Sequence, residues 1–85
     1  MASKKNIENA WDKAKTIRGQ NDEVWRKDPY ENKIRKGSYG THGDFGWELD
    51  HKNPVAKGGS DKQQNIQPIH WEENLKKSDK YPYKK

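Results

Sequence analysis

One stretch in the second half of the chain contains the side chains whose types and spacing could do chemistry. Asp50 and His51 are neighbours at the end of a short apolar run, and Asn65 follows fourteen residues after His51. Asn74 and Lys77 come later, three residues apart. An imidazole exchanges a proton near neutral pH, and carboxylate and carboxamide oxygens bind hard cations. These residues could therefore support proton transfer, a metal site, or both.

The composition narrows both the chemistry and the partners. The chain has 85 residues and no cysteine, which excludes a disulfide and a thiolate zinc site, so a metal would need oxygen and imidazole ligands. Its formal net charge of +5 favours polyanions such as DNA, RNA or an acidic membrane surface, although a basic soluble protein without a specific partner is the plainer alternative. No apolar run approaches the roughly 20 residues of a membrane span, and no signal-peptide pattern is visible at the start. We therefore expect a cytoplasmic protein with no membrane partner, which the absence of cysteine also fits.

The packed core is expected to be small and aromatic. Only 27% of the residues are hydrophobic and 36% are charged, a balance that by itself favours disorder. Aromatic side chains bury large areas and can offset the shortage of aliphatic residues. The predicted core tryptophans are Trp11, Trp25, Trp47 and Trp71. The length predicts one domain over residues 1–85.

The elements that must position the chemical side chains follow from apolar periodicity and turn residues, and they predict the α+β class. A helix is predicted over residues 3–19, which has apolar residues at helical spacing and a glycine at its end. Residues 20–32 are expected to form turns. Short strands are expected around Ile34, over residues 45–51 and over residues 65–69, and a second helix over residues 69–77 with Pro68 in its first turn.

The second predicted helix divides its side chains between two faces. His70, Asn74 and Lys77 are spaced to share one face, which taken alone is typical of an ordinary solvated surface. Trp71 and Leu75 share another face and are expected to point to the core. On the preceding strand, consecutive side chains point to opposite sides, so Asp50-His51 can serve one site only if the strand ends or bulges there.

This ordered set resembles the HNH nuclease motif, also called the ββα-metal finger. The quoted segments are "LDH", "NPVAKGGSD", "NIQPI" and "NLKKSD". The family pattern has Asp-His at the end of the first strand, a Gly-Gly loop, a central Asn opening the second strand, and a helix with Asn or His followed by Lys. The matching residues are Asp50, His51, Gly58, Gly59, Asn65, Asn74 and Lys77.

The resemblance covers a finger core at residues 45–79. An N-terminal helix and extension at residues 1–44 and a basic tail at residues 80–85 lie outside it. The segment "WRKDPYENKIRKGSYG" also looks like sequence found ahead of the motif in small bacterial and phage-type members. We therefore expect a small ββα-metal finger with an N-terminal helix and aromatic-rich irregular segments.

The resemblance also implies roles for the matching residues. His51 would be the general base that activates water, and Asn65 would serve catalysis by tying the long loop to the strand of His51 and so fixing the ring. Asp50 and Asn74 would hold one divalent ion that stabilises the leaving group. Hard oxygen ligands favour Mg²⁺, with Mn²⁺ as an alternative, over Zn²⁺ or Ni²⁺.

Several cationic side chains are expected to contact phosphate. Lys77 would contact phosphate or act as a charge partner beside the metal ligands. His70 could add a ligand, touch the leaving group or contact phosphate, whereas His42 is left without a role. The other expected phosphate contacts are Lys52, Lys57 and Arg35.

The resulting interpretation is a metal-dependent endonuclease that hydrolyses DNA with little sequence preference. A catalytically inactive basic nucleic-acid-binding module is one alternative, and the intact base and ligands argue against it. A second alternative keeps the chemistry but places it in an interbacterial toxin domain, which would act in the cytoplasm of a target cell. The corresponding partners would be an immunity protein or, for a phage enzyme, a packaging protein.

Overall fold

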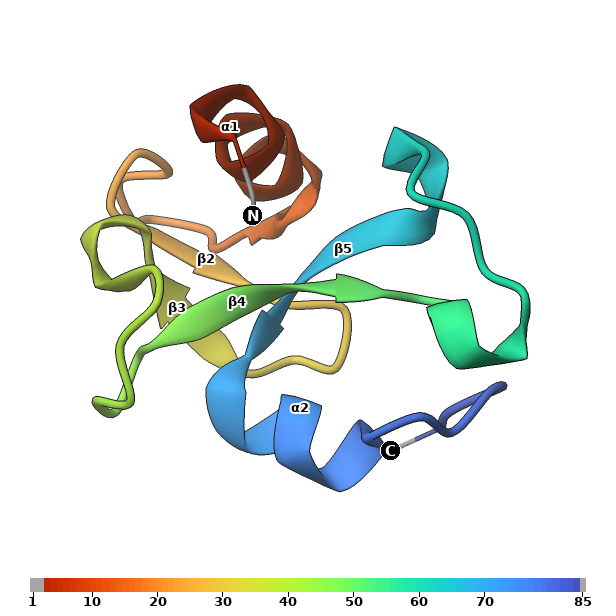
Figure 1. Ribbon diagram of the computed structural model, residues 1–85. Helices are drawn as coiled ribbons and strands as arrows, with labels where there is room; N and C mark the ends of the chain where they lie inside the picture. Colours follow the sequence, from red (N-terminus) through yellow and green to blue (C-terminus); the bar gives the residue numbers. More distant parts are fainter. Residues whose placement is uncertain (1–2, 85) are drawn as a thin grey trace.

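Two small antiparallel sheets and two helices make up the chain, as the computed structural model of residues 3–84 shows, and the predicted α+β class is confirmed (Figure 1). The first sheet has the order β1-β2-β3 and the second pairs β4 with β5. The helices are α1 (Lys4–Lys13) and α2 (Trp71–Lys77). The strands are β1 (Lys15–Thr16), β2 (Trp25–Lys27), β3 (Lys33–Arg35), β4 (Trp47–His51) and β5 (Ile66–His70). Short 3-10 helices span Lys36–Ser38, Val55–Lys57 and Gln63–Asn65.

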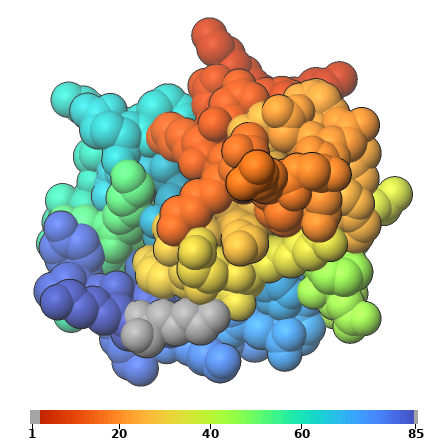
Figure 2. Space-filling model, turned by 180° about the vertical axis from the view of Figure 1, so that it is seen from behind, coloured from red at the N-terminus to blue at the C-terminus, as the bar shows by residue number. Residues whose placement is uncertain are grey.

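The arrangement places the N-terminal segments on one side and the finger on the other. In Figure 1, α1 lies above the crossing of β4 and β5, and α2 lies below it. From behind, α1 and the three-stranded sheet, coloured red to yellow, cover the upper and right parts of the face (Figure 2). Within residues 3–84, no helix is long and apolar enough to cross a membrane.

Helix α1 begins as predicted but ends six residues before Gly19. The hydroxyl of Ser3 accepts a hydrogen bond from the backbone amide of Asn6 at 3.1 Å and caps the first turn. Ala14 is already extended, and the chain then pairs as β1 with β2. The predicted helix over residues 3–19 is therefore too long, and the predicted turn region contains a strand.

A buried arginine explains where α1 stops. The Nη1 atom of Arg26 in β2 donates to the carbonyl oxygens of Trp11, Asp12 and Ala14, at 3.1, 3.2 and 3.4 Å. Carbonyls in the last turn of a helix lack an intrahelical partner. The guanidinium satisfies them and fixes β2 against the end of α1.

The core is small and aromatic, as predicted, but only two of the four tryptophans form it. Trp11 and Trp47 are fully buried, with ring centroids 5.4 Å apart, and Ile34 packs in the same cluster. Trp25 is half-buried, edge-on to an aromatic neighbour, and Trp71 is half-buried at the surface. The core predictions for Trp25 and Trp71 are therefore wrong.

Strand β5 continues through His70, so the predicted helix start at residue 69 is also wrong. All five residues of β5 pair with β4, and Pro68 lies opposite Leu49 rather than in a helical turn. The carboxylate of Asp28 accepts a hydrogen bond from the backbone amide of His70 at 2.9 Å and holds the end of the strand. Because residues 66–70 are in the strand, the helix begins only at Trp71.

The face of α2 that meets the sheet is polar, which corrects the expected apolar anchor. Leu75 is 71% exposed, whereas Glu73 and Lys77 are buried. Each of these two charges has a distant partner: Glu73 accepts a hydrogen bond from Asn32 at 3.0 Å, and Lys77 pairs with Asp50. The Lys77–Asp50 ion pair and the hydrogen bonds of Glu73, rather than Leu75, hold this face of the helix in place.

The C-terminal segment is docked at Tyr83. The hydroxyl of Tyr83 donates to Glu73, and its ring lies edge-on to Tyr30 with centroids 5.3 Å apart. Of the predicted tail at residues 80–85, Lys85 lies outside the described residues, as do Met1 and Ala2 in the predicted extension at residues 1–44.

Candidate functional site

The side chain of Asn65 joins the two ends of the loop that connects β4 to β5. Its Oδ1 accepts a hydrogen bond from the backbone amide of Asn53 at 2.9 Å. Its Nδ2 donates to the carbonyl oxygens of Asn53 and Ser60, at 3.0 and 2.7 Å. The backbone amide of Lys52 donates to the carbonyl of Asn65 at 2.8 Å. These bonds tie the loop to the end of the strand that carries His51.

The two glycines of this loop are required by its tight path. Gly58 has a φ of 87°, in the left-handed region that glycine adopts without steric cost. A Cβ atom on Gly59 would lie 1.7 Å from the carbonyl oxygen of Asn53. The loop therefore folds back on the end of β4 only because side chains are missing there.

The His51 ring is fixed by an acid that the sequence did not single out. Its Nε2 lies 2.7 Å from Oδ1 of Asp61, and the two side chains are 34% and 91% exposed. A carboxylate can only accept, so in the neutral ring Nε2 carries the proton and Nδ1 keeps its lone pair. Within residues 3–84, no hydrogen bond reaches Nδ1. The sequence signal for this contact is an acidic residue in the loop that follows the Asp-His pair.

Asp50 is a buried carboxylate with two protein partners. It is 8% exposed, and its Oδ2 accepts a hydrogen bond from Nε2 of Gln67 at 2.9 Å. The Nζ atom of Lys77 lies 3.3 Å from the same oxygen and donates to the carbonyl of His51 at 3.0 Å. Lys77 is only 1% exposed and cannot contact a phosphate. Of its two predicted roles, the charge partner of Asp50 fits the structure.

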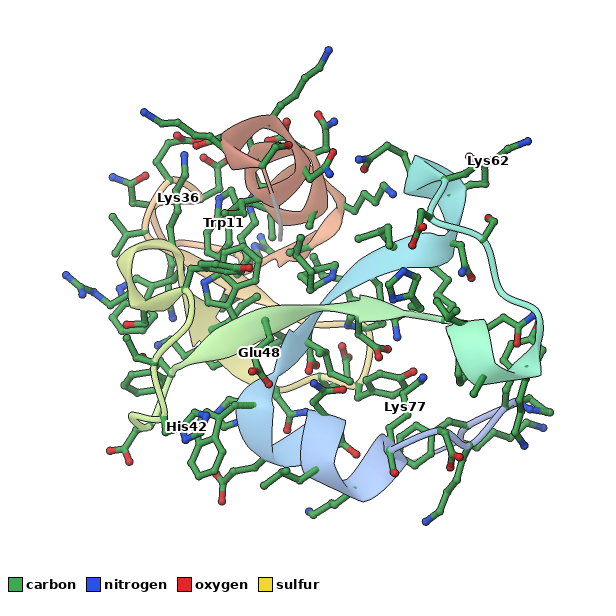
Figure 3. All side chains as sticks on the ribbon, viewed as in Figure 1. Trp11, Lys36, His42, Glu48, Lys62 and Lys77 are labelled. Atoms are coloured by element: carbon green, nitrogen blue, oxygen red, sulfur yellow. The ribbon has the colours of Figure 1, made fainter. Side chains whose placement is uncertain are left out.

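Asn74 faces a second acid of β4. Its Nδ2 donates to Oε1 of Glu48 at 3.1 Å. Figure 3 shows Glu48 and Lys77 between the ribbon of β4 and α2. Successive turns of α2 thus pair with alternate residues of β4: Asn74 with Glu48, and Lys77 with Asp50. This arrangement brings both predicted metal ligands to the interface of β4 and α2, bonded to different partners.

The oxygen atoms at this interface fit a hard divalent cation. Within residues 3–84, no group of three or more His, Cys, Asp and Glu side chains could hold a metal. A cation would therefore rest on few protein ligands, which Mg²⁺ tolerates because it keeps several waters. An ionised carboxylate offers about four lone-pair positions, so Asp50 can accept from Gln67 and Lys77 and still bind a cation. The carboxamide oxygen of Asn74 is a donor of the same hard type.

His70 belongs to the scaffold rather than to an exposed contact surface. It is buried at the end of β5, and its Nε2 donates to the carbonyl of Asp44 at 2.7 Å. Its Nδ1 accepts a hydrogen bond from the backbone amide of Glu72 at 3.1 Å and so caps the start of α2. With both ring nitrogens bonded, His70 has no free atom for phosphate or metal. His42 is exposed and stacks on Trp71, with centroids 4.5 Å apart.

The remaining predicted phosphate contacts are on the surface. Lys52, Lys57 and Arg35 are exposed, and Lys52 follows His51 directly. Burial, and next the charge of Lys52, lowers the pKa of Lys13 at the end of α1. Lys52 and Lys13 therefore place positive charge near the end of β4, whereas Arg35 is on β3 in the other sheet.

Two antiparallel strands followed by a helix, with Asp-His closing the first strand, define a ββα finger. Residues 40–80 match the family model described as HNH endonuclease. This match assigns the segment, 41 of the 85 residues, to the HNH endonuclease family, and the small α+β domain agrees with the ββα fold. The match indicates nuclease-type activity on nucleic acid in general terms, and HNH nucleases generally use a divalent metal. No curated protein and no solved structure matches the chain.

Proposed function

We propose that this protein is a metal-dependent endonuclease that hydrolyses phosphodiester bonds of DNA, with His51 as the general base. The observation that carries the proposal is the His51 ring at the end of β4, held at Nε2 by Asp61 and adjacent to the buried Asp50. This hydrogen bond leaves Nδ1 to take a proton from water, and a neutral imidazole has a suitable affinity for a proton near pH 7.

The other predicted residues would bind the divalent ion and the phosphate groups and would position His51. Asp50 and Asn74 would hold one divalent ion, with Mg²⁺ favoured and Mn²⁺ an alternative, because their donors are hard oxygens. Such an ion, when bound, would stabilise the charge that develops on the leaving oxygen. Asn65 would keep the loop closed against His51. The exposed side chains proposed to contact phosphate are Lys52, Lys57 and Arg35.

We also propose that residues 1–85 act as a single domain. Trp11 of α1, Ile34 of β3 and Trp47 of β4 belong to one buried cluster, so the N-terminal part and the finger share a core. Separating the N-terminal part would expose Trp47, which is fully buried. The finger therefore depends on the extension for its packing.

A plasmid assay tests the proposed activity. Supercoiled DNA is incubated with the pure protein in Mg²⁺, Mn²⁺, Ni²⁺, Zn²⁺ or EDTA, and nicked and linear products are separated on a gel. We expect cleavage in Mg²⁺ or Mn²⁺ and none in EDTA. Binding of DNA without cleavage in any metal would support the inactive binding module instead.

A further inference from the structure

The hydrogen bond between Asn74 and Glu48 determines how the Asn74 amide is turned. The two atoms, Nδ2 and Oε1, are 3.1 Å apart in a partly buried position. An ionised carboxylate accepts hydrogen bonds and donates none, so the NH₂ end of the amide must face Glu48. The orientation thus follows from the chemistry of the partner and not from the shape of the amide, whose two ends are nearly alike.

This orientation leaves the other end of the amide available. Within residues 3–84, no hydrogen bond reaches Oδ1 of Asn74, and Oδ1 is the atom of this side chain that can bind a hard cation. A flipped amide would present NH₂ instead, and NH₂ groups donate and do not bind cations. A flip exchanges two groups of similar size, so packing alone resists it weakly.

We propose that Glu48 is a positioning residue that holds Asn74 with its oxygen turned toward a divalent ion. The proposal rests on the proposed function, in which Asn74 is a metal ligand. Glu48 and Asp50 are two residues apart on β4 and therefore lie on the same side of the strand, the side that meets α2. Glu48 also adds negative charge next to the buried Asp50, which favours a cation at this interface.

Metal affinity tests the proposal without relying on activity. Free Mn²⁺ is measured by electron paramagnetic resonance during titration of the parental protein and of Glu48→Gln, Asn74→Ala and Asp50→Asn. A glutamine at position 48 can accept or donate, so it no longer determines which end of the Asn74 amide faces it. Groups that orient a metal ligand typically change affinity by about 10–100-fold, and we expect Glu48→Gln to weaken Mn²⁺ binding within that range. Glu72→Gln is the matched control, because it removes the same charge from an exposed position on α2.

A double variant separates loss of the fixed amide orientation from loss of charge or of folding. In Glu48→Gln/Asn74→Asp the donor and the acceptor exchange sides while the summed charge is kept. The new amide can donate to one carboxylate oxygen and leave the other for the cation. We expect this variant to recover most of the affinity that Glu48→Gln loses; failure to recover it, with intact circular dichroism, would contradict a role through the hydrogen bond.

Carbon chemical shifts during a Mg²⁺ titration separate a positioning residue from a direct ligand. We expect the Asn74 Cγ signal to respond to Mg²⁺ in the parental protein and to lose this response in Glu48→Gln, while Glu48 Cδ responds weakly. A Glu48 Cδ response as large as that of Asn74 would overturn the positioning role and make Glu48 a ligand.

The failures of the inference and of the proposed function are distinguishable. If Asn74→Ala and Asp50→Asn weaken Mn²⁺ binding but Glu48→Gln matches the Glu72→Gln control, the positioning role is wrong and the ligand set stands. If Asn74→Ala binds Mn²⁺ as tightly as the parental protein, the ligand set itself is wrong and the role of Glu48 is overturned with it.

Discussion

Nε2 of His51 lies 2.7 Å from Oδ1 of Asp61, across the loop that follows β4. The carboxylate fixes the ring from the solvent side, because the Asp61 side chain is 91% exposed. The ring therefore has one nitrogen occupied and the other available, which is the state that a base acting through Nδ1 requires.

Removing the acid should slow cleavage without abolishing it. Asp61→Ala leaves the His51 ring free to rotate, and we expect the single-turnover rate of plasmid nicking to fall by about tenfold, a small part of what a general base contributes. Asp61→Asn keeps an oxygen that can accept from Nε2 and should retain most of the rate. Parental rates in Asp61→Ala would show that the contact does not position the base.

Asn65 should contribute to stability through its three side-chain hydrogen bonds. Asn65→Ala removes all three and leaves the loop ends without their link. At about 1 kcal/mol per bond we expect the free energy of unfolding to fall by about 2–3 kcal/mol, measured by urea denaturation. Gln64→Ala, at the exposed neighbouring position, is the control and should change it little. Equal stabilities of the two variants would contradict the structural role of Asn65.

Much of the finger could be predicted from the sequence because its signals are local. Alternation around residues 47–51 and the Gly-Gly loop specify the strand ending at His51 and the tight return to Asn65. The end of α1 could not be predicted in this way, because it depends on Arg26. This residue is in β2, a strand further along the chain that contacts the end of the helix only in the folded structure.

The candidate site was harder to predict where it depends on distant pairs. The spacing of Trp71 and Leu75 predicts an apolar helix face, but the buried face carries Lys77, whose partner is on β4. The contacts of Asp61 and Glu48 could not be predicted for the same reason. Each acid bonds to a residue of another segment, and spacing alone does not show which acid meets which partner. The β4–β5 register and the path of the loop decide this.

Breaking the buried ion pair of Lys77 should be costly. Lys77→Met leaves the Asp50 carboxylate buried without its cationic partner, and loss of one member of such a pair typically costs about 3–5 kcal/mol. Chemical denaturation should show a loss in this range, and Lys77→Met/Asp50→Asn should recover part of it. Lys76→Met, on the exposed side of α2, serves as the control. A stability loss no larger than that of Lys76→Met would mean that the pair does not anchor the helix.

The docked C-terminus should respond to alkaline pH. The hydrogen bond to Glu73, followed by partial burial, raises the pKa of Tyr83 to about 12 from 10.0. Because the folded-state pKa is raised, the stabilisation from docking is complete below pH 10 and is lost as the pH rises toward 12. A tyrosinate absorbance titration should lose its highest-pH component in Tyr83→Phe. Glu73→Gln should move that component to lower pH, and an unmoved component would contradict the docking contact.

The most direct test of the account compares two histidine variants in single-turnover plasmid cleavage with saturating Mg²⁺. His51→Ala removes the proposed base, whereas His42→Ala removes an exposed imidazole that stacks on Trp71 at the start of α2. We predict that His51→Ala lowers the cleavage rate by at least about 100-fold, the lower bound for a general base, while DNA and Mn²⁺ binding persist and His42→Ala cuts at the parental rate. Cleavage by His51→Ala at the parental rate would contradict the account.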